Sequence, residues 1–186
     1  MRDIALTGLA RSGKDSVAAR LIDYHGYVRV AFADPLKEAA LKADPIISAC
    51  GYSDGEIDME RLSQVVNEMG WERAKDLFPE VRRFLQYFGQ TIRDLDSSFW
   101  VRAAFGKIRQ ARAQGRPVVV TDVRYTNEAD ALLSAGFDIV RVERPGLVPG
   151  QHISEREMAG YPVSATIVND DTLSALSVKA DGLTSL

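Results

Sequence analysis

Short apolar runs of strand type alternate with helical patterns along most of the chain, and this alternation constrains the fold more than any other feature. The strand-type runs lie at residues 4–8, 28–33, 117–122, 137–143 and 165–168. The helical patterns lie at residues 17–22, 36–42, 128–135 and 173–178. Strands separated by helices pair in parallel through right-handed crossovers. The order therefore predicts a three-layer α/β fold around a central parallel sheet, with the β-branched run at 117–122 inside the sheet.

The loop after the first run reads Gly-Leu-Ala-Arg-Ser-Gly-Lys-Asp-Ser over residues 8–16. It fits the spacing G-x-x-x-x-G-K between a strand and a helix, which is typical of a phosphate-binding loop. Gly8 and Gly13 allow backbone N–H groups to turn toward a phosphate chain, and Lys14 can bridge its terminal phosphates. The alternative is a glycine-rich turn with a solvated lysine.

The position after Lys14 usually carries Ser or Thr, whose hydroxyl binds Mg²⁺, and here it is Asp15. Either Asp15 holds the metal, directly or through water, or Ser16 does. The alternative role of Asp15 is to complement the helix dipole. Asp122 ends an apolar strand, where P-loop enzymes place a metal-binding carboxylate, although such an Asp can also cap a turn. We predict a Mg²⁺ site among Asp15, Ser16 and Asp122.

Ligands of parallel sheets gather at the carboxyl ends of the strands. Gly8, Asp34 and Asp122 follow or end predicted strands, so we expect them to converge on one crevice. Arginines that suit a site for two phosphorylated substrates are Arg11, Arg83, Arg93, Arg124, Arg144 and Arg156. We expect about half of them to reach the site.

Two segments break the alternation. Residues 45–80 are polar and irregular and residues 81–114 are mostly helical without a strand signal, so we expect a helical insertion at 44–114. Residues 144–163 are rich in Pro and Gly and are expected to form a short lid, with an ordinary surface loop as the alternative. Because no linker separates these segments, we expect a single domain over residues 1–186.

The composition excludes several classes of protein. The chain has 186 residues, 46% of them apolar, which is enough for a hydrophobic core. The net charge of −3 does not suggest a broad surface for nucleic acid. Cys50 is the single cysteine, which points to a reducing compartment, and no apolar run is long enough to span a membrane. We expect a cytoplasmic protein without nucleic-acid or membrane partners.

Several motifs resemble those of the bacteriophage-type deoxynucleoside monophosphate kinases, which belong to the P-loop kinases. The motifs are residues 11–16, 32–37, 83–93 with Trp100 and Val101, 121–129, and 152–155. Members of this family commonly have an Asp after the loop lysine, so Asp15 supports the resemblance. Residues 43–78 match no motif of the family and are a candidate for base or dimer specificity.

The resemblance implies a P-loop kinase fold and ATP-dependent phosphorylation of deoxynucleoside 5′-monophosphates to diphosphates, with Mg²⁺, in the host cytoplasm if the source is a phage. The implied ATP-binding residues are Gly8, Arg11, Ser12, Gly13, Lys14, Asp15 and Ser16. The implied acceptor-binding residues are Arg11, Asp34, Lys37, Arg83, Gln86, Gln90, Arg93 and Trp100. Catalysis is assigned to Lys14, Arg124 and Arg156, and a homodimer is left open.

Other functions remain as alternatives. One is another small-molecule P-loop kinase, with phosphomevalonate or dephospho-coenzyme A as the acceptor. Another is an ATPase or regulator that has no small acceptor. The segment 86–93 favours a nucleotide acceptor, because the Gln86 and Gln90 amides can read a base edge while Arg93 holds a phosphate.

Overall fold

The computed structural model describes residues 2–51, 56–148 and 156–185. By its internal contacts the chain divides into two compact units. The first unit comprises Met1–Phe32 together with Val101–Leu186, and the second comprises Ala33–Trp100. Within the described ranges, no helix is long and apolar enough to cross a membrane.

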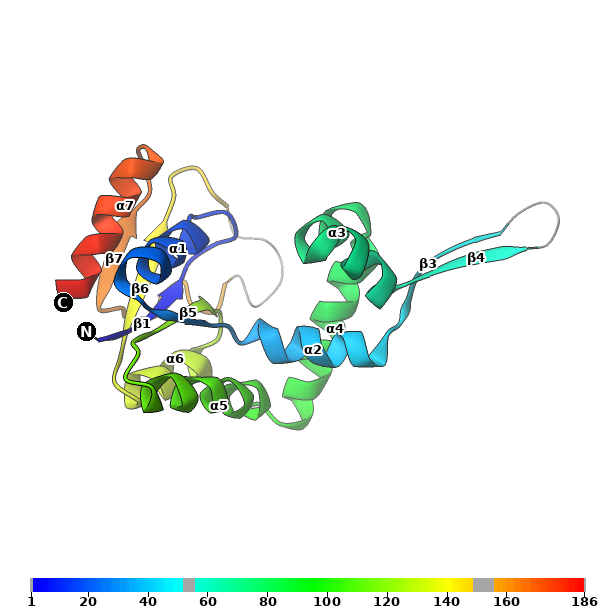
Figure 1. Cartoon of the computed structure of the whole chain (residues 1–186), viewed down its shortest axis with the longest axis horizontal. Helices are drawn as coiled ribbons and strands as arrows, with labels where there is room; N and C mark the ends of the chain where they lie inside the picture. Colours follow the sequence, from blue (N-terminus) through cyan, green and yellow to red (C-terminus); the bar gives the residue numbers. More distant parts are fainter. Residues whose placement is uncertain (1, 52–55, 149–155, 186) are drawn as a thin grey trace. The chain divides into compact units, whose positions relative to one another are not determined.

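The first unit is built on a five-stranded sheet. Its strands are β1 (Asp3–Thr7), β2 (Val28–Val30), β5 (Val118–Val123), β6 (Phe137–Glu143) and β7 (Ala165–Val168) (Figure 1). They are hydrogen-bonded in the order β2-β5-β1-β6-β7, and every pairing is parallel. The predicted parallel sheet is confirmed, although β2 ends at Val30 while the apolar run continues to Ala33.

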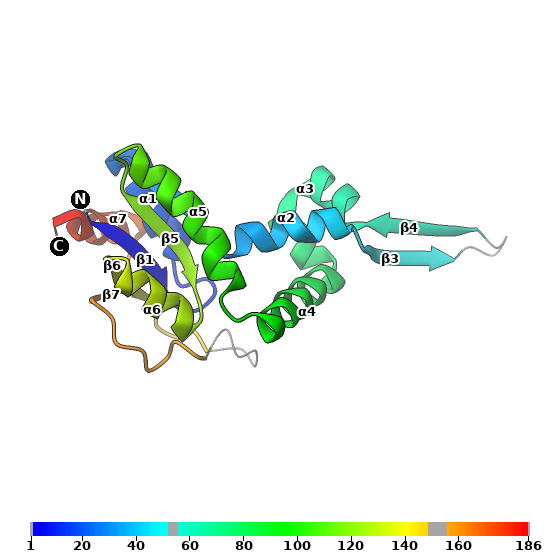
Figure 2. The ribbon, with the colours of Figure 1, turned by 90° about the horizontal axis from the view of Figure 1, so that it is seen from below.

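Helices cover both faces of this sheet (Figure 2). The helices are α1 (Lys14–His25) and α7 (Leu173–Gly182) on one face, and α5 (Phe99–Ala113) and α6 (Thr126–Ser134) on the other. Alternate residues of a strand point to opposite faces. In β1, Ile4 and Leu6 therefore join the core beneath α1 and α7, and Ala5 joins the core beneath α5 and α6. Burial of each large aliphatic side chain contributes about 1.5 to 3 kcal/mol to the stability of the fold. The helices on both faces of the sheet confirm the predicted three layers.

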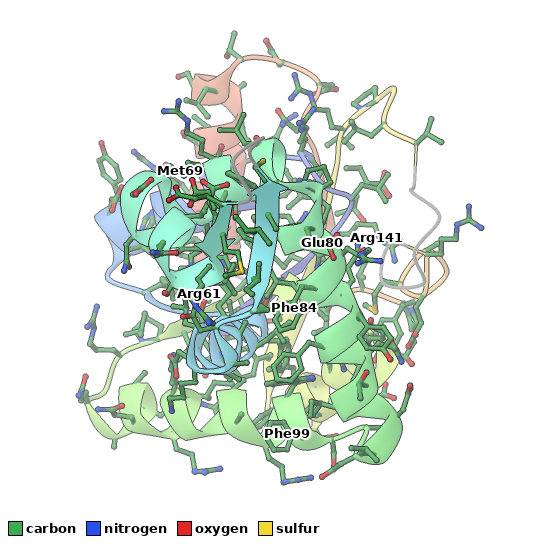
Figure 3. All side chains as sticks on the ribbon, turned by 90° about the vertical axis from the view of Figure 1, so that its right-hand side faces the viewer. Arg61, Met69, Glu80, Phe84, Phe99 and Arg141 are labelled. Carbon is green, nitrogen blue, oxygen red and sulfur yellow. The ribbon has the colours of Figure 1, made fainter. Side chains whose placement is uncertain are left out.

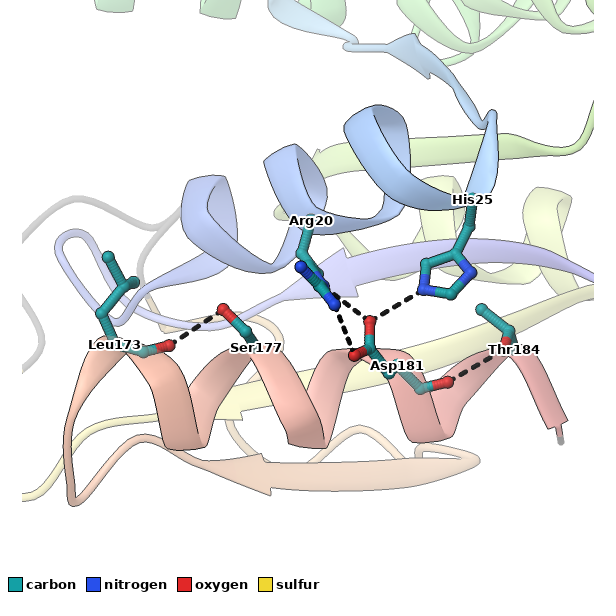
Figure 4. Close-up of polar contacts among 6 residues, drawn as sticks. All are labelled: Arg20, His25, Leu173, Ser177, Asp181 and Thr184. Atoms are coloured by element: carbon teal, nitrogen blue, oxygen red, sulfur yellow. Dashed lines mark hydrogen bonds and ion pairs between the residues drawn. The ribbon is translucent and has the colours of Figure 1, made fainter.

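An ion-pair cluster joins α1 to α7 at the surface (Figure 4). The Asp181 carboxylate accepts hydrogen bonds from Arg20 Nε at 2.8 Å and Arg20 Nη2 at 2.9 Å, and it lies 2.8 Å from His25 Nε2. The hydrogen bonds from Arg20, and then the one with His25, hold the pKa of Asp181 well below its usual range. Because α1 continues directly from the phosphate loop, this cluster fixes the helix on which that loop is mounted.

The second unit contains three helices and two strands. They are α2 (Ala33–Ala43), β3 (Ile46–Gly51), β4 (Ile57–Arg61), α3 (Leu62–Leu77) and α4 (Pro79–Leu95). Pro35 lies in the first turn of α2, as the sequence predicts. Ala40 of α2, Val65 of α3 and Val81 of α4 belong to one core, against which Phe84 packs. Figure 3 shows Phe84 on α4 among the side chains of this unit.

Strands β3 and β4 form an antiparallel hairpin inside residues 45–80, so our expectation that this segment is irregular, within a helical insertion, is wrong there. Ala49 pairs with Met59 and Gly51 pairs with Ile57, which places small and apolar residues on one face. The alternation covers only a few residues on each strand. For that reason it is hidden within a segment whose composition is polar overall.

The second unit also differs in extent from the expected insertion at 44–114. It includes α2, whereas α5 from Val101 onward belongs to the first unit. Ala104 and Ile108 of α5 are buried in the core that packs against the sheet, which explains why this helix belongs to the first unit and not to the insertion. Residues 45–80, expected to be irregular, contain all of α3.

The expected lid at 144–163 is described only in part. Residues 149–155 lie outside the described residues, and the motif at 152–155 lies there with them. Residues 156–161 form consecutive turns, with Ala159 N donating to Arg156 O at 3.0 Å and Tyr161 N donating to Met158 O at 3.2 Å. The lid itself stays a prediction.

Candidate active site

The loop between β1 and α1 requires glycine at both glycine positions of the phosphate-loop spacing. Gly8 and Gly13 have φ values of +140° and +107°, a region that favours glycine. A Cβ at Gly8 would collide with the carbonyl oxygen of Val142. A Cβ at Gly13 would lie 2.6 Å from Asn169 Nδ2. Both the backbone conformation and the close packing therefore demand glycine.

The side chain of Lys14 folds back over this loop. Its Nζ donates to the carbonyl oxygen of Gly8 at 2.8 Å and to that of Leu9 at 2.6 Å. Ser12 is buried, and its carbonyl oxygen accepts a hydrogen bond of 2.9 Å from Asn169 Nδ2. The loop is thus held by its own lysine and by the residue that follows β7.

A cavity of about 430 Å³ opens beside the phosphate loop at the carboxyl ends of β1, β5, β6 and β7. Gly8 and Ser12 line it from the loop. Three arginines line it from other segments: Arg124 after β5, Arg141 in β6 and Arg144 after β6. Loop N–H groups and guanidinium groups are the donors that bind phosphate oxygens, so this cavity suits a phosphorylated ligand.

The predicted catalytic residues Arg124 and Arg156, and the candidate Arg144, differ in how they relate to this cavity. Arg124 is exposed and lines it, and so does Arg144. Arg156 is exposed in the turns at 156–161, whose Met158 and Ala159 line the cavity. A direct role for Arg156 therefore stays a prediction.

The predicted metal ligands belong to two elements of the first unit. Asp15 and Ser16 lie exposed in the first turn of α1, and Asp122 lies in β5. Asp122 Oδ1 also accepts a hydrogen bond of 2.8 Å from the backbone N of Phe32, which ties the end of β2 to β5. All three residues offer the oxygen atoms that Mg²⁺ prefers.

The small number of protein ligands at this site is compatible with Mg²⁺. In the part of the chain that the structure describes, no group of three or more His, Cys, Asp or Glu residues could hold a metal alone. Mg²⁺ commonly takes one or two protein carboxylates and completes its shell with waters and substrate phosphates. The donor set therefore fits a metal that arrives with a nucleotide.

The predicted acceptor residues on α4 lie on a helix, as expected. Gln86, Gln90 and Arg93 follow each other at spacings of four and three, which places them along one side. Gln90 Nε2 donates to Asp94 Oδ1 at 2.8 Å, and Gln90 Oε1 is buried and has no hydrogen-bond partner among the described residues. Arg83 is paired with Glu80, and this ion pair raises the pKa of the Arg83 guanidinium.

Trp100 has a structural contact within the second unit. Its side chain is buried, and its Nε1 donates to the carbonyl oxygen of Gly89 at 3.1 Å. A Cβ at Gly89 would lie 3.1 Å from Leu36 Cδ2, so glycine allows α2 to approach α4 closely. Trp100 can shape α4, but its only hydrogen-bond donor on the side chain is already used.

Asp34 and Lys37, the other predicted acceptor residues, lie in α2. Lys37 Nζ lies 5.5 Å from the centroid of the Trp71 ring, within reach of a cation–π contact. Of the three residues expected to converge, Gly8 and Asp122 lie at the ends of the neighbouring strands β1 and β5. Asp34 belongs to the second unit, so its part in the convergence stays a prediction.

Sequence reasoning missed two residues that build the site. Arg141 lines the cavity, and the signal for it was a charge between the buried Val140 and Val142 of a strand. Asn169 supports the loop at Ser12 and directly follows β7. The rule that ligands gather at strand ends could have found Asn169.

Comparisons with known proteins bear on this site. Residues 54–180 match the family model of deoxynucleotide monophosphate kinases. A protein of Acanthamoeba polyphaga mimivirus, provisionally named a deoxynucleotide monophosphate kinase, is 30% identical over 190 residues, covering 91% of this chain and 89% of that protein. The uncharacterised protein ORF77 of Ictalurid herpesvirus 1 is 34% identical over 138 residues, which cover 68% of this chain but only 60% of the viral protein.

Among solved structures, TT1252 from Thermus thermophilus has a TM-score of 0.50 at 17% identity, with 100% of this chain and 98% of that chain covered. This likeness concerns the fold alone. The sheet order, the phosphate loop and the arginine-lined cavity define a phosphotransferase of the P-loop kinase type. The extent of the family match then shows that the chain belongs to the deoxynucleotide monophosphate kinase family. Its relatives named above come from a mimivirus and a herpesvirus, so a phage origin stays a prediction.

Proposed function

We propose that the protein transfers the γ-phosphoryl group of ATP to the 5′-phosphate of a deoxynucleoside monophosphate, releasing ADP and a deoxynucleoside diphosphate. The observation that carries the proposal is the cavity in which Arg124, Arg141 and Arg144 meet the phosphate loop. Membership of the deoxynucleotide monophosphate kinase family supports the class of acceptor.

The phosphate loop binds the donor. Gly8, Arg11 and Gly13 present backbone N–H groups to the ATP phosphates. The Ser12 N–H instead donates to the carbonyl oxygen of Leu9 at 3.2 Å, so Ser12 would contribute its side-chain hydroxyl. Lys14 exchanges the two loop carbonyls that it now contacts for oxygens of the terminal phosphates. This exchange preserves the hydrogen bonds of the ammonium and adds an opposite charge, so it is favourable in a partly buried site.

The transfer needs no general base. An oxygen of the acceptor phosphate, already anionic near neutral pH, forms a bond to the γ-phosphorus while the bond from that phosphorus to the bridging oxygen of ADP breaks. Negative charge spreads over the oxygens in transit, and Lys14, Arg124 and Arg156 stabilise it. Catalysis rests on positioning and on electrostatic stabilisation.

Asp15, Ser16 and Asp122 are the residues of this chain that would hold Mg²⁺, which supplies neutralisation of charge on the ATP phosphates. Asp15 and Ser16 adjoin Lys14 at the start of α1, close in sequence to the groups that bind the same phosphates.

The acceptor is bound mainly by the second unit. Arg93 grips the acceptor phosphate, and Gln86 and Gln90 read the base. The Gln90 amide NH₂ donates to Asp94 Oδ1, which fixes the orientation of this side chain on α4. The remaining acceptor residues are Arg11, Asp34, Lys37, Arg83 and Trp100.

A panel of acceptors tests the proposal. ADP release is followed with each deoxynucleoside monophosphate, each ribonucleoside monophosphate, phosphomevalonate, dephospho-coenzyme A, and no acceptor. We expect ADP release to rise strongly with at least one deoxynucleoside monophosphate. ADP release that rises only with phosphomevalonate or dephospho-coenzyme A would contradict the proposal. ADP release that is the same with every acceptor as with none would contradict it as well.

A further inference from the structure

Helix α6 begins at Thr126, two residues after Arg124, which is one of the arginines that line the cavity. The first N–H groups of a helix have no partner within it. Here the backbone N of Arg124 and that of Tyr125 both donate to Glu128 Oε2, at 2.9 and 3.2 Å. Glu128 is only 1% exposed, so this carboxylate holds the backbone of Arg124 from inside the protein.

A second carboxylate reaches the same turn from a distant part of the chain. Glu157 Oε1 accepts hydrogen bonds from the backbone N and the Oγ1 of Thr126, each at 2.9 Å. Both carboxylates lie at the N-terminal end of α6, where the helix dipole favours negative charge. Glu157 thus caps a helix whose first residue precedes it by 31 positions.

Glu157 belongs to residues 156–161, which we call the anchored turn. Arg141 Nη2 donates to the carbonyl oxygens of Met158 at 2.7 Å and of Tyr161 at 2.8 Å. The hydroxyl of Tyr161 donates to Asp130 Oδ1 at 2.6 Å. Burial, and then the hydrogen bond to Asp130, raise the pKa of Tyr161 to about 12, so the hydroxyl keeps its proton, and remains a donor, into the alkaline range.

The contacts of the anchored turn join three walls of the cavity. Met158 and Ala159 of the turn line the cavity, Arg141 is bound to carbonyls of the turn, and Arg124 adjoins the helix end that Glu157 caps. Loss of the Glu157 contact therefore releases the backbone next to Arg124 on one side, while Glu128 still holds it on the other.

We propose that Glu157 is a positioning residue for Arg124: by capping α6 at Thr126, it holds the Arg124 guanidinium where the phosphoryl group is transferred. This inference rests on the proposed function, because it needs Arg124 to act on the transferring phosphate. Misplacement of a catalytic group by about 1 Å costs up to about 10²-fold in rate.

The first test compares steady-state kinetics of Glu157→Ala and Glu157→Gln. We expect Glu157→Ala to lower kcat about 10-fold or more while KM for ATP changes less than about twofold, since the phosphate loop is untouched. Glu157→Gln keeps an oxygen acceptor for Thr126 and should recover part of the loss. Asp138→Ala is the control, because Asp138 pairs with Arg2 at the start of β6, at the opposite end of the sheet. It should leave kcat unchanged.

The decisive test is a double-mutant cycle with Arg124→Ala. If Glu157 acts through Arg124, then Glu157→Ala should lower kcat less than about twofold further when Arg124 is already replaced. Losses that multiply in the double variant would show that Glu157 serves the fold or another residue, and would overturn the inference. A wild-type kcat for Glu157→Ala would overturn it as well.

Amide hydrogen exchange separates this inference from the proposed function, since it needs no activity. The Thr126 amide should exchange faster in Glu157→Ala than in the wild type, while amides of α1 should not change. Unchanged exchange at Thr126 would mean that the cap is absent, and would overturn the inference alone. Failure of the wild type to phosphorylate any monophosphate would overturn the proposed function and the inference together.

Discussion

At the scale of single residues, the phosphate loop is constrained by three backbone conformations. Gly8, Arg11 and Gly13 all have positive φ values. The two glycines have no space for a side chain, and Arg11 adopts the left-handed region at +63°, which is uncommon for a residue with a Cβ. Such turns point successive N–H groups into one concavity. Because these constraints are local, the spacing of the glycines was enough to predict the loop.

Replacement of Lys14 tests the role of the loop in binding the donor. Lys14→Ala should lower kcat for phosphoryl transfer by about 10² to 10³ or more, because a positive charge is removed from the transferring phosphate. The variant should still fold, since Lys14 is only partly buried and its contacts are with the loop itself. Kinetics and a thermal melt together check this. A variant with nearly wild-type kcat would refute the assignment of the loop.

Replacement of Asp15 tests the metal site. If Asp15 holds Mg²⁺ directly or through water, Asp15→Asn should raise the Mg²⁺ concentration needed for half-maximal activity. A residue that only complements the helix dipole would change stability by about 0.3 to 1 kcal/mol and leave the Mg²⁺ dependence as it was. A Mg²⁺ titration of activity distinguishes the two roles, and the second result would leave Ser16 and Asp122 as the ligands.

At the scale of elements, the alternation of strands and helices was predictable because each element has its own hydrophobic period. The hairpin β3–β4 was not, since its apolar face is short and, within the described part of the chain, its two strands pair with each other and with no third strand. The contacts that organise the site were equally hidden. Glu157 meets Thr126, and Asn169 meets Ser12, across long stretches of chain. Nothing in the local sequence encodes such pairings, which depend on the finished fold.

The tie between α1 and α7 has a pH dependence that can be predicted. Asp181 has a folded-state pKa below its unfolded value, so its stabilising contribution is present above the unfolded pKa of about 3.9 and is lost as the pH falls through the folded value. Asp181→Asn should therefore lower Tm at pH 7, and the difference from the wild type should shrink below about pH 4.

Ser177→Ala is the matched control for this measurement. The Ser177 hydroxyl donates to the carbonyl oxygen of Leu173 at 3.0 Å within α7 and carries no charge (Figure 4). Its effect on Tm should not depend on pH in the same range. A difference for Asp181→Asn that stays constant from pH 7 to pH 3 would contradict the ion-pair account.

Helix α4 gives the sharpest test of the acceptor side. Arg93→Ala should raise KM for the deoxynucleoside monophosphate at least about tenfold while KM for ATP stays nearly constant, because this guanidinium binds the phosphate of only one substrate. Arg93→Lys should restore little, since an ammonium lacks the bidentate geometry. Equal effects on both substrates, or no effect on either, would mean that the acceptor does not bind along this side of α4.

At the scale of the whole molecule, the chain combines a parallel sheet that carries the phosphate loop with a second, mainly helical unit. The donor residues and the predicted metal ligands all belong to the first unit. Most of the predicted acceptor residues belong to the second. This division suits a transferase with two phosphorylated substrates, because each substrate can be recognised by its own set of elements.

The central claim is that a phosphoryl group passes from ATP to a deoxynucleoside monophosphate. Transfer of label from [γ-³²P]ATP, resolved by chromatography against the four deoxynucleoside monophosphates, measures it directly, with the Lys14→Ala variant as the control for contaminating kinases. We predict a labelled deoxynucleoside diphosphate that forms with the wild type and not with the variant. Label that appears only as inorganic phosphate, or equally with both proteins, would contradict the account.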